Sequence, residues 1–118
     1  MVKMKNCESK DCIFCKIISW EFKTEFTYED KDFVVFKSIA NESPTHLLIV
    51  PKKHYVTIED MVNQELNKMS DIFKIAKDIA EKHNLEWYKL NCNVWTKWWQ
   101  EVPHLHMHLL SESELFVN

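Results

Sequence analysis

The alternation of apolar and polar side chains along the chain predicts five β-strands. The stretches "TEFTYED" and "DFVVFKSI" are rich in aromatic and β-branched residues and flank a polar turn around Asp30–Asp32, which predicts a β-hairpin. The segment "THLLIVP", Thr45–Pro51, predicts a third strand that is closed by a proline. A fourth strand is expected in "YKLNCNV", Tyr88–Val94, and a fifth in "PHLHMHLL".

Helical periodicity marks two segments of different length. Gln64–His83 has apolar residues at i, i+3 and i+4 and predicts the main helix, with Asn63 as its N-cap. The expected buried stripe of this helix is Leu66, Met69, Ile72, Phe73, Ala76, Ile79 and Ala80. Cys12–Ser19 predicts a short helix. Its apolar side would consist of Ile13, Phe14 and Ile17.

The order of these elements predicts an α+β fold. We expect a five-stranded antiparallel sheet with one main helix and a short N-terminal helix, because the connections are mostly short and helices and strands are not regularly interleaved. At 118 residues the chain is long enough to bury a core of its own, so residues 1–118 are predicted to form one domain.

Composition and charge exclude several classes of protein. A formal net charge of −3 with mixed signs gives no broad basic surface, so nucleic acid is not expected as a primary partner. The longest apolar runs, such as "LLIV", are far too short to span a membrane. The start "MVKMKNCESKDC" lacks the apolar segment of a secretion signal. We therefore expect a cytoplasmic protein whose four cysteines are thiols or metal ligands.

The stretch "HLHMHLL" carries the strongest chemical signal in the chain. In a strand, successive side chains point to opposite faces, so Leu105, Met107 and Leu109 would point into the core. The opposite face would then be lined by His104, His106 and His108. A polar strand face is ordinarily made of Thr, Lys or Glu, so three imidazoles in register favour metal binding, attack on phosphorus or proton transfer. The alternative is a half-buried strand whose polar residues happen to be histidines.

This stretch resembles the histidine-triad pattern, His-φ-His-φ-His-φ-φ, where φ is an apolar residue. Further blocks are similar to the same family in the same order: "CIFCKII", "YEDKDFVVFKSI", "SPTHLLIVPKKH", "YKLNCNV" and "WQEVPHLHMHLL". The resemblance covers Cys12 to Leu110 and is closest to the nucleoside phosphoramidase branch with a CxxC zinc site. It implies a small α+β homodimer in which two sheets join into a continuous one.

The resemblance also implies a double displacement at the α-phosphorus of a nucleotide. His106 would be the nucleophile and would form a nucleotidyl-imidazole intermediate, provided that its second nitrogen is held by a nearby carbonyl. His108 would donate to the phosphate oxygens, and His46 would complete the network. The alternative for His46 is a half-buried histidine with a purely structural role. Asn93 matches an amide beside the phosphate, and Glu101 would protonate the leaving group.

The expected ligand is a purine nucleotide or a nucleoside phosphoramidate. The apolar wall around its base would be formed by Ile13, Phe14, Ile17, Phe36 and Ile39, although these are also ordinary core residues on periodicity alone. Ser38 departs from the family, which often has an aspartate there that binds both ribose hydroxyls. A serine offers a weaker grip on the ribose.

The pair "CIFC", Cys12 and Cys15, has the spacing of half a tetrahedral zinc site, but redox CxxC motifs have the same spacing. In the zinc-binding branch the other two ligands correspond to His54 and His104. Such a Cys₂His₂ set implies a structural Zn²⁺ that fastens the N-terminal helix to the sheet. The alternative is two reduced thiols and two histidines without metal.

The chain has no glycine and five tryptophans. At the usual frequency of about 7%, roughly eight glycines are expected in a chain of this length. All five tryptophans fall where the resembled family commonly has glycine: Trp20, Trp87, Trp95, Trp98 and Trp99. One hypothesis is that UGA codons for glycine have been translated as tryptophan; the alternative is genuine indoles that cap the site.

These observations leave three functions to separate. The first is an enzyme that cleaves nucleoside 5′-phosphoramidates or adenylylated amines, with dinucleoside polyphosphate hydrolysis as a variant. The second is a zinc-stabilised nucleotide-binding protein without turnover, which Ser38 and indoles near the phosphate would favour. The third, a zinc-only interaction module, is weak because the chain is acidic and lacks a basic recognition helix.

Overall fold

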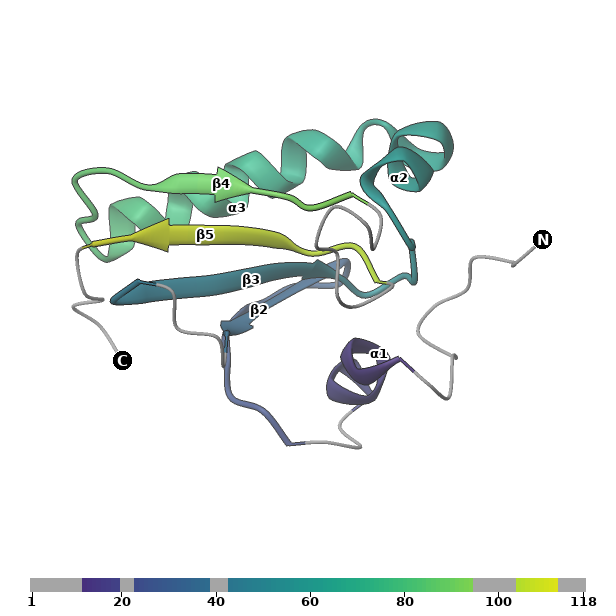
Figure 1. Cartoon of the computed structure of the whole chain (residues 1–118), viewed down its shortest axis with the longest axis horizontal. Coiled ribbons are helices and arrows are strands. Elements are labelled where there is room, and N and C mark those ends of the chain that lie inside the picture. The colour runs from purple at the N-terminus through teal and green to yellow at the C-terminus, as the bar shows by residue number, and fades with distance from the viewer. Residues whose placement is uncertain (1–11, 20–22, 39–42, 95–103, 113–118) are drawn as a thin grey trace.

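The structure is a computed structural model, which describes residues 12–19, 23–38, 43–94 and 104–112. The element order is α-β-β-β-α-α-β-β (Figure 1). The helices are α1 (Ile13–Ile18), α2 (Ile58–Glu65) and α3 (Lys68–Lys82). The strands are β1 (Phe26–Glu29), β2 (Phe33–Lys37), β3 (Thr45–Pro51), β4 (Lys89–Asn91) and β5 (Met107–Ser111).

The five strands form one antiparallel sheet in the order β1-β2-β3-β5-β4, which confirms the predicted α+β class. β3 is the central strand, and it pairs with β2 on one side and β5 on the other. The predicted fifth strand begins at Pro103, whereas β5 begins four residues later at Met107. His104 and His106 therefore precede the strand, where their side chains and carbonyls make hydrogen bonds outside the ladder.

The predicted hairpin turn is built around the Asp30 carboxylate. Its Oδ1 accepts hydrogen bonds from the backbone N–H groups of Asp32 and Phe33, both at 2.7 Å, and its Oδ2 accepts one from the Tyr28 hydroxyl at 2.7 Å. The N–H of Asp30 donates to the Phe33 carbonyl at 2.9 Å. An aspartate that binds nearby backbone N–H groups in this way supports a tight turn, and here it joins β1 to β2.

The single predicted main helix is in fact two helices. α2 begins six residues before Gln64, and its N-cap is Thr57 rather than Asn63. The Thr57 side chain accepts from the Asp60 N–H, and the Asp60 carboxylate accepts from the Thr57 N–H, which forms a capping box. The helical hydrogen-bonding pattern is interrupted at Leu66–Asn67 before α3 begins.

The buried face of α3 also differs from the predicted stripe. Its buried residues are Ile72, Ile75, Ala76, Ile79 and Ala80, which form one helical face. Leu66 is 64% exposed and Phe73 is 52% exposed, so both lie outside the core. The predicted stripe did not include Ile75. Because Ile75 is buried, the buried face of α3 is rotated about the helix axis relative to the predicted stripe, and Leu66 and Phe73 lie outside the buried face.

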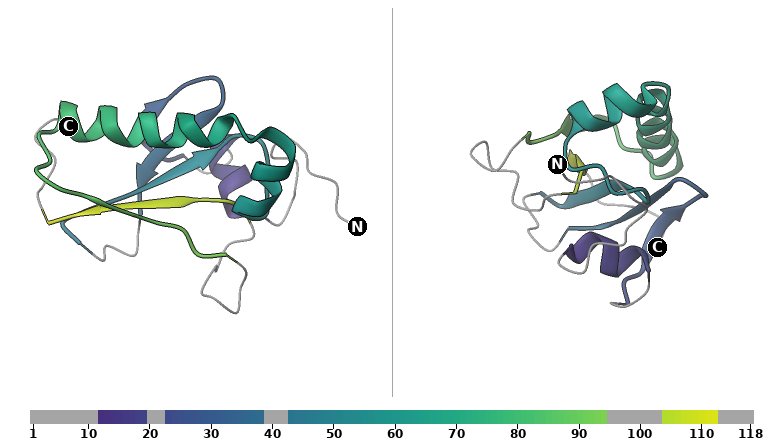
Figure 2. Two further views of the ribbon diagram at one scale, coloured as in Figure 1. Left: turned by 90° about the horizontal axis from the view of Figure 1, so that it is seen from above. Right: turned by 90° about the vertical axis from the view of Figure 1, so that its right-hand side faces the viewer.

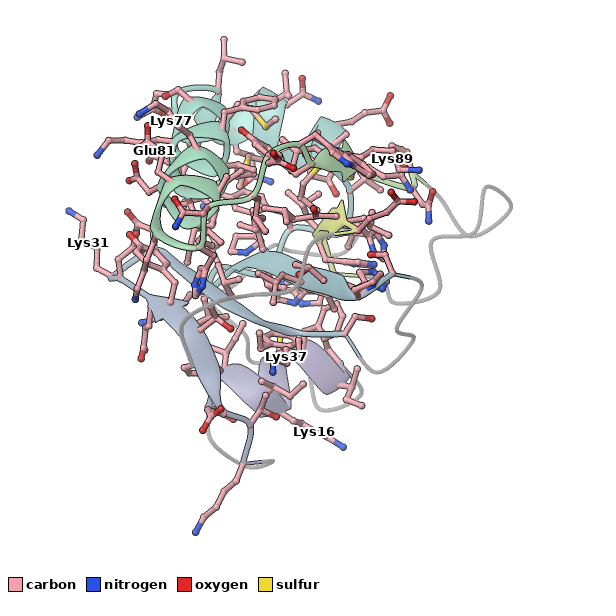
Figure 3. All side chains as sticks on the ribbon, turned by 90° about the vertical axis from the view of Figure 1, so that its left-hand side faces the viewer. Lys16, Lys31, Lys37, Lys77, Glu81 and Lys89 are labelled. Atoms are coloured by element: carbon pink, nitrogen blue, oxygen red, sulfur yellow. The ribbon has the colours of Figure 1, made fainter. Side chains whose placement is uncertain are left out.

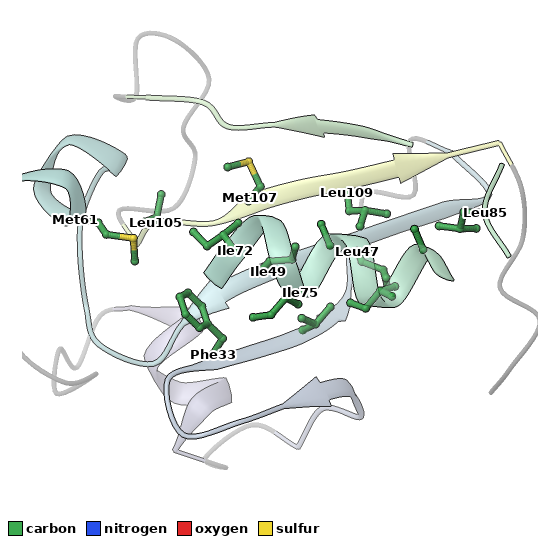
Figure 4. Close-up of a cluster of buried hydrophobic side chains, with 14 of the residues drawn as sticks. Phe33, Leu47, Ile49, Met61, Ile72, Ile75, Leu85, Leu105, Met107 and Leu109 are labelled. Carbon is green, nitrogen blue, oxygen red and sulfur yellow. The ribbon is translucent and has the colours of Figure 1, made fainter. Parts of the chain in front are cut away.

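The helices cover opposite faces of the sheet (Figure 2). The larger apolar cluster lies between α2, α3 and the sheet and includes Phe33, Leu47, Ile49, Ile72 and Leu109 (Figure 4). Leu105 and Met107 also belong to this cluster, as the alternation in "HLHMHLL" predicts. A smaller cluster packs α1 against the other face of the sheet. In the described part of the chain, no helix has the length and apolar character needed to cross a membrane.

Candidate functional site

Two central strands bring His46 and His108 together. His46 on β3 pairs with Leu110 on β5, and Leu48 pairs with His108, so the two histidines are diagonal neighbours on one face of the sheet. Their ring centroids are 5.1 Å apart, and His46 Nε2 lies 2.8 Å from His108 Nδ1. One ring nitrogen must therefore donate to the other, which couples the orientation of the two imidazoles.

His106 is held by its own backbone neighbour. Its Nδ1 lies 2.8 Å from the carbonyl oxygen of His104, so Nδ1–H donates and the lone pair of a neutral ring is on Nε2. This hydrogen bond is the one that nucleophilic attack by His106 would require. The ring is 5.0 Å from that of His108 and makes an edge contact with Phe14 at 5.0 Å. Both contacts fix the plane of the imidazole.

His104 takes part in a different cluster. Its side chain is fully buried, and its Nε2–H donates to the Pro51 carbonyl at 2.9 Å. Burial lowers the pKa of His104 to about 3, although the Pro51 hydrogen bond partly opposes the shift. The imidazole is therefore neutral, with a lone pair on Nδ1. That atom faces Cys12 Sγ at 3.2 Å and Cys15 Sγ at 3.5 Å.

The same two thiols face His54, which completes a buried Cys₂His₂ set. Cys15 Sγ is 3.1 Å from His54 Nδ1, and the four ligand atoms all lie within 4.8 Å of one another. Tetrahedral Zn²⁺, with bonds of about 2.3 Å to sulfur and about 2.0 Å to nitrogen, would hold these atoms roughly 3.5 Å apart. The residues therefore fit a zinc ion in donor type, number and spacing, as predicted for these four positions.

The surroundings of the cluster also suit a metal. Cys12 is the N-cap of α1, and its sulfur accepts a hydrogen bond from the Cys15 N–H at 3.4 Å. This hydrogen bond fixes the Cys12 sulfur at the start of α1, beside the other three ligand atoms. The hydrogen bond from His104 to Pro51 supplies the kind of outer contact that orients a metal-binding imidazole.

Other predicted site residues lie around the histidines. Ser38 is buried at the end of β2, and its N–H donates to the His46 carbonyl at 2.9 Å. Asn93 is half-buried just after β4. Phe14, Ile17 and Phe36 belong to the smaller apolar cluster. They pack α1 onto the sheet beside His106, where Phe14 contacts the ring of Phe36 at 5.7 Å.

Ile13 does not share the buried side of α1. The predicted apolar side combined it with Phe14 and Ile17, but Ile13 is 44% exposed while the other two are buried. Cys15 takes the remaining buried place on α1, because its sulfur must face His54 and His104. Ile13 is thus the one of these apolar side chains that presents a large surface to solvent.

Some of the predicted positions lie outside the described residues. These are Glu101, Ile39, Trp20, Trp95, Trp98 and Trp99. Trp87 is described, and it is 49% exposed with a carbonyl that accepts a hydrogen bond from Ser111 Oγ at 2.7 Å. Among the described residues only Asn84 has a positive φ, so the backbone at Trp87 has no need for glycine.

Tyr55 is a site-supporting residue that the sequence pattern did not reveal. It is fully buried, and its carbonyl accepts from the Leu105 N–H at 2.6 Å, between His104 and His106. Its hydroxyl donates to the Glu65 carboxylate. In the sequence, the only indication of this supporting role is that Tyr55 directly follows His54 in "PKKHYV". An aromatic residue there is equally consistent with simple packing.

The fold and the site define an α+β protein with a histidine row, made of His46, His106 and His108, on and beside its central strands, together with a Cys₂His₂ cluster. The family model described as "Scavenger mRNA decapping enzyme C-term binding" matches residues 11–116. The chain is 33% identical over 104 residues to the purine nucleoside phosphoramidase of Escherichia coli (strain K12), with 86% of this chain and 87% of that protein covered.

Two solved structures are similar to this chain in both fold and sequence. A histidine triad protein from Clostridium difficile has a TM-score of 0.84 at 34% identity, covering 94% of this chain and 98% of that chain. A HIT family hydrolase from Legionella pneumophila Philadelphia 1 has a TM-score of 0.81 at 39% identity, covering 88% and 95%. The chain belongs to the histidine triad (HIT) family, and the comparisons support a nucleotide hydrolase at the level of the family.

Proposed function

We propose that the protein hydrolyses nucleoside 5′-phosphoramidates or adenylylated amines through a nucleotidyl-histidine intermediate. The observation that carries the proposal is the hydrogen bond from His106 Nδ1 to the His104 carbonyl. It fixes the tautomer whose lone pair is on Nε2, which is the form that attacks an electrophile. The likeness to the Escherichia coli purine nucleoside phosphoramidase supports the substrate class.

The first step forms a bond between His106 Nε2 and the α-phosphorus and breaks the bond from phosphorus to the leaving nitrogen. The leaving amine takes the electron pair of that bond together with a proton, which we assign to Glu101. In the second step water adds to phosphorus and gives one proton to the Glu101 carboxylate, the bond from phosphorus to Nε2 breaks with its electron pair returning to the imidazole, and the nucleoside monophosphate leaves. The histidine then returns to its neutral form, in which Nδ1 keeps its proton and still donates it to the His104 carbonyl.

His108 and His46 would stabilise the charge that develops on the phosphate oxygens. If His46 donates from Nε2, then His108 Nδ1 accepts, and the proton of neutral His108 is on Nε2. From there His108 can donate to a phosphate oxygen as its negative charge grows. The 2.8 Å contact thus links a residue on β3 to the chemistry on β5.

The remaining roles concern substrate binding. We assign Asn93 to the phosphate, Ser38 to the ribose, and Ile13, Phe14, Ile17, Phe36 and Ile39 to the wall around a purine base. The exposure of Ile13 supports direct contact with a ligand, whereas the burial of Phe14, Ile17 and Phe36 gives these residues a packing role as well. Because serine lacks a carboxylate, ribose recognition would be weaker than with an aspartate.

The bound ion would be a structural Zn²⁺ held by Cys12, Cys15, His54 and His104. All four side chains are buried, and a four-ligand set leaves no open position for substrate. The ion would fasten α1 and the segment after β3 to His104. His106 is two residues further on, so the ion would fix the backbone carbonyl that holds the nucleophile.

We also propose a homodimer formed through β4. This strand lies at one edge of the sheet. Phe73 is exposed on α3, and Leu66 is exposed just before this helix begins. One turn beyond Phe73, the pKa of Lys77 is raised by the Glu81 hydrogen bond and more weakly by Tyr88, which directly precedes β4. An edge strand beside exposed apolar side chains is a typical pairing surface.

Replacement of His106 by asparagine tests the proposed reaction. The wild-type protein should hydrolyse adenosine 5′-phosphoramidate, whereas His106→Asn should lose at least a thousandfold in kcat and still bind AMP within a few-fold. His83→Gln is the matched control, since it removes an imidazole at the end of α3, away from the row. An active His106→Asn protein would refute the assignment of the nucleophile.

A nucleotide-binding protein without turnover is the second candidate, and Ser38 favours it. In that case the wild-type protein and His106→Asn would bind AMP equally, and neither would cleave a phosphoramidate. Cleavage of diadenosine polyphosphates by the wild-type protein, with no cleavage of phosphoramidates, would instead identify a dinucleoside polyphosphate hydrolase. The same assay with two substrates therefore separates the three functions.

A further inference from the structure

A hollow of about 600 Å³ lies away from the histidine row, where the β1–β2 turn, the segment after β3 and the junction of α2 and α3 meet. Four lysines and two carboxylates line it, and Ile18 and Ser19 at the end of α1 close one side. The charged residues are Lys31, Asp32, Lys52, Lys53, Glu65 and Lys68. An excess of positive charge is thus concentrated at one place in a chain whose net charge is −3.

The two carboxylates are already engaged by lysines of the hollow. Glu65 accepts from Lys53 at 3.2 Å and lies 3.3 Å from Lys68, which is also 3.5 Å from Asp32. Burial works to raise the pKa of Glu65, but hydrogen bonds from Lys53 and Lys68 outweigh it and lower the pKa. Glu65 therefore stays ionised, yet two carboxylates are too few to neutralise four ammonium groups.

The other two lysines leave the hollow positive. Lys52 pairs at 2.9 Å with Glu29, which lies on β1 outside the lining residues. Lys31 is exposed on the β1–β2 turn, and among the described residues it has no ion-pair partner (Figure 3). Ion pairs between partly exposed side chains are weak, so these lysines can exchange a carboxylate for a ligand anion.

The lining points to the kind of anion. Among the described lining residues there is no aromatic side chain on which a nucleobase would stack, and Ile18 is the one aliphatic residue. Several ammonium groups around an open hollow suit a compact anion with several charged oxygens. We propose that this hollow binds an inorganic polyphosphate, such as pyrophosphate or tripolyphosphate, as a site separate from the histidine row.

Lys52 and Lys53 directly follow β3, whereas His46 is the second residue of this strand and His108 pairs with Leu48. The strand from His46 to Lys52 spans roughly 20 Å, so one small anion cannot contact both His46 and these lysines. His104 is nearer, but its ring nitrogens face the Pro51 carbonyl and the two thiols, and no histidine is among the described residues that line the hollow. The His54 side chain, one residue after Lys53, belongs to the Cys₂His₂ cluster. Binding in the hollow should therefore be independent of the histidine row.

Titration of ¹⁵N-labelled protein with tripolyphosphate tests the proposal. The amide signals of residues 31–33, 52, 53 and 68 should shift together, with the same affinity in the wild-type protein and in His106→Asn. In Lys31→Gln/Lys52→Gln the affinity of the hollow should fall about a hundredfold, since two charge-assisted contacts are lost and each is worth roughly tenfold. These two lysines were chosen because neither pairs with Glu65 or Asp32.

Lys74→Gln/Lys82→Gln is the matched control, because it removes the same charge from exposed positions of α3 that do not line the hollow. It should bind like the wild-type protein. The proposal is overturned if the two double variants lose affinity equally, if the shifts are confined to the histidine row, or if sulfate at equal ionic strength binds as well as tripolyphosphate. The last result would indicate general ion screening only.

Discussion

Replacement of Cys15 by serine is the sharpest perturbation of the proposed zinc site. The Cys15 sulfur lies 3.1 Å from His54 Nδ1 and 3.5 Å from His104 Nδ1, so it contacts both imidazoles of the cluster. Serine removes one thiolate ligand and leaves the main core untouched, because Cys15 belongs to the smaller apolar cluster under α1. We expect a folded protein that has lost its stabilisation by metal.

The magnitude follows from binding linkage. A free Zn²⁺ concentration 100 times the Kd stabilises the folded state by about 2.7 kcal/mol. For 118 residues the unfolding entropy is about 0.25 kcal/mol/K, at roughly 2.1 cal/mol/K per residue. Removal of the ion should therefore lower the Tm of the wild-type protein by about 11 °C.

Thermal unfolding with and without a chelator measures this difference, and elemental analysis of each sample shows whether the ion has been removed. The wild-type protein should lose about 11 °C in chelator, whereas Cys15→Ser should start near the lower Tm and change little. Cys92→Ser, outside the cluster, should respond to the chelator like the wild-type protein. If the wild-type Tm does not move when the zinc is gone, a structural role is refuted.

Three further predictions concern the turn, the dimer and the tryptophans. Burial works to raise the pKa of Asp30, but hydrogen bonds from Tyr28 and the backbone outweigh burial and lower the pKa. The ionised Asp30 side chain therefore stabilises the folded protein above its unfolded-state pKa of about 3.9, and this stabilisation is lost as the pH falls. Asp30→Asn should therefore destabilise the protein by about 1–3 kcal/mol at pH 7 and by progressively less as the pH falls through the lowered pKa of Asp30, as measured by urea unfolding. Phe73→Glu should shift the protein toward monomer in light scattering while the neighbouring Lys74→Glu does not; an unchanged dimer would place the interface elsewhere. The coding sequence should have UGA at all five tryptophan positions, and a single UGG would contradict the recoding hypothesis.

The strands were predictable from the sequence because their patterns are local. Thr45–Pro51 is a strand over its full predicted length, and the polar turn at Asp30 lies where the hairpin pattern places it. The grouping of Cys12, Cys15, His54 and His104 was predictable only through the family resemblance. Cys12 and His104 are 92 residues apart, and no local pattern indicates which distant histidine completes a CxxC pair.

The errors have physical causes. The stripe from Leu66 to Phe73 fits a continuous helix, but the Thr57 capping box starts a separate helix earlier, and Ile75 turns the buried face of α3. His104 follows the alternation expected of a strand, yet its backbone lies before β5 and its side chain faces the thiols. The contacts of the Tyr55 carbonyl and hydroxyl depend on tertiary packing, which a sequence pattern does not encode.

Intact-mass analysis during turnover tests the role of His106 most directly. The wild-type protein mixed with adenosine 5′-phosphoramidate and quenched at alkaline pH should gain the mass of one AMP less one water. Peptide mapping should place the added group on His106, and His106→Asn should show no addition. An adduct on another residue, or substrate consumed by the wild-type protein with no adduct at any quench time, would contradict nucleophilic attack by this histidine.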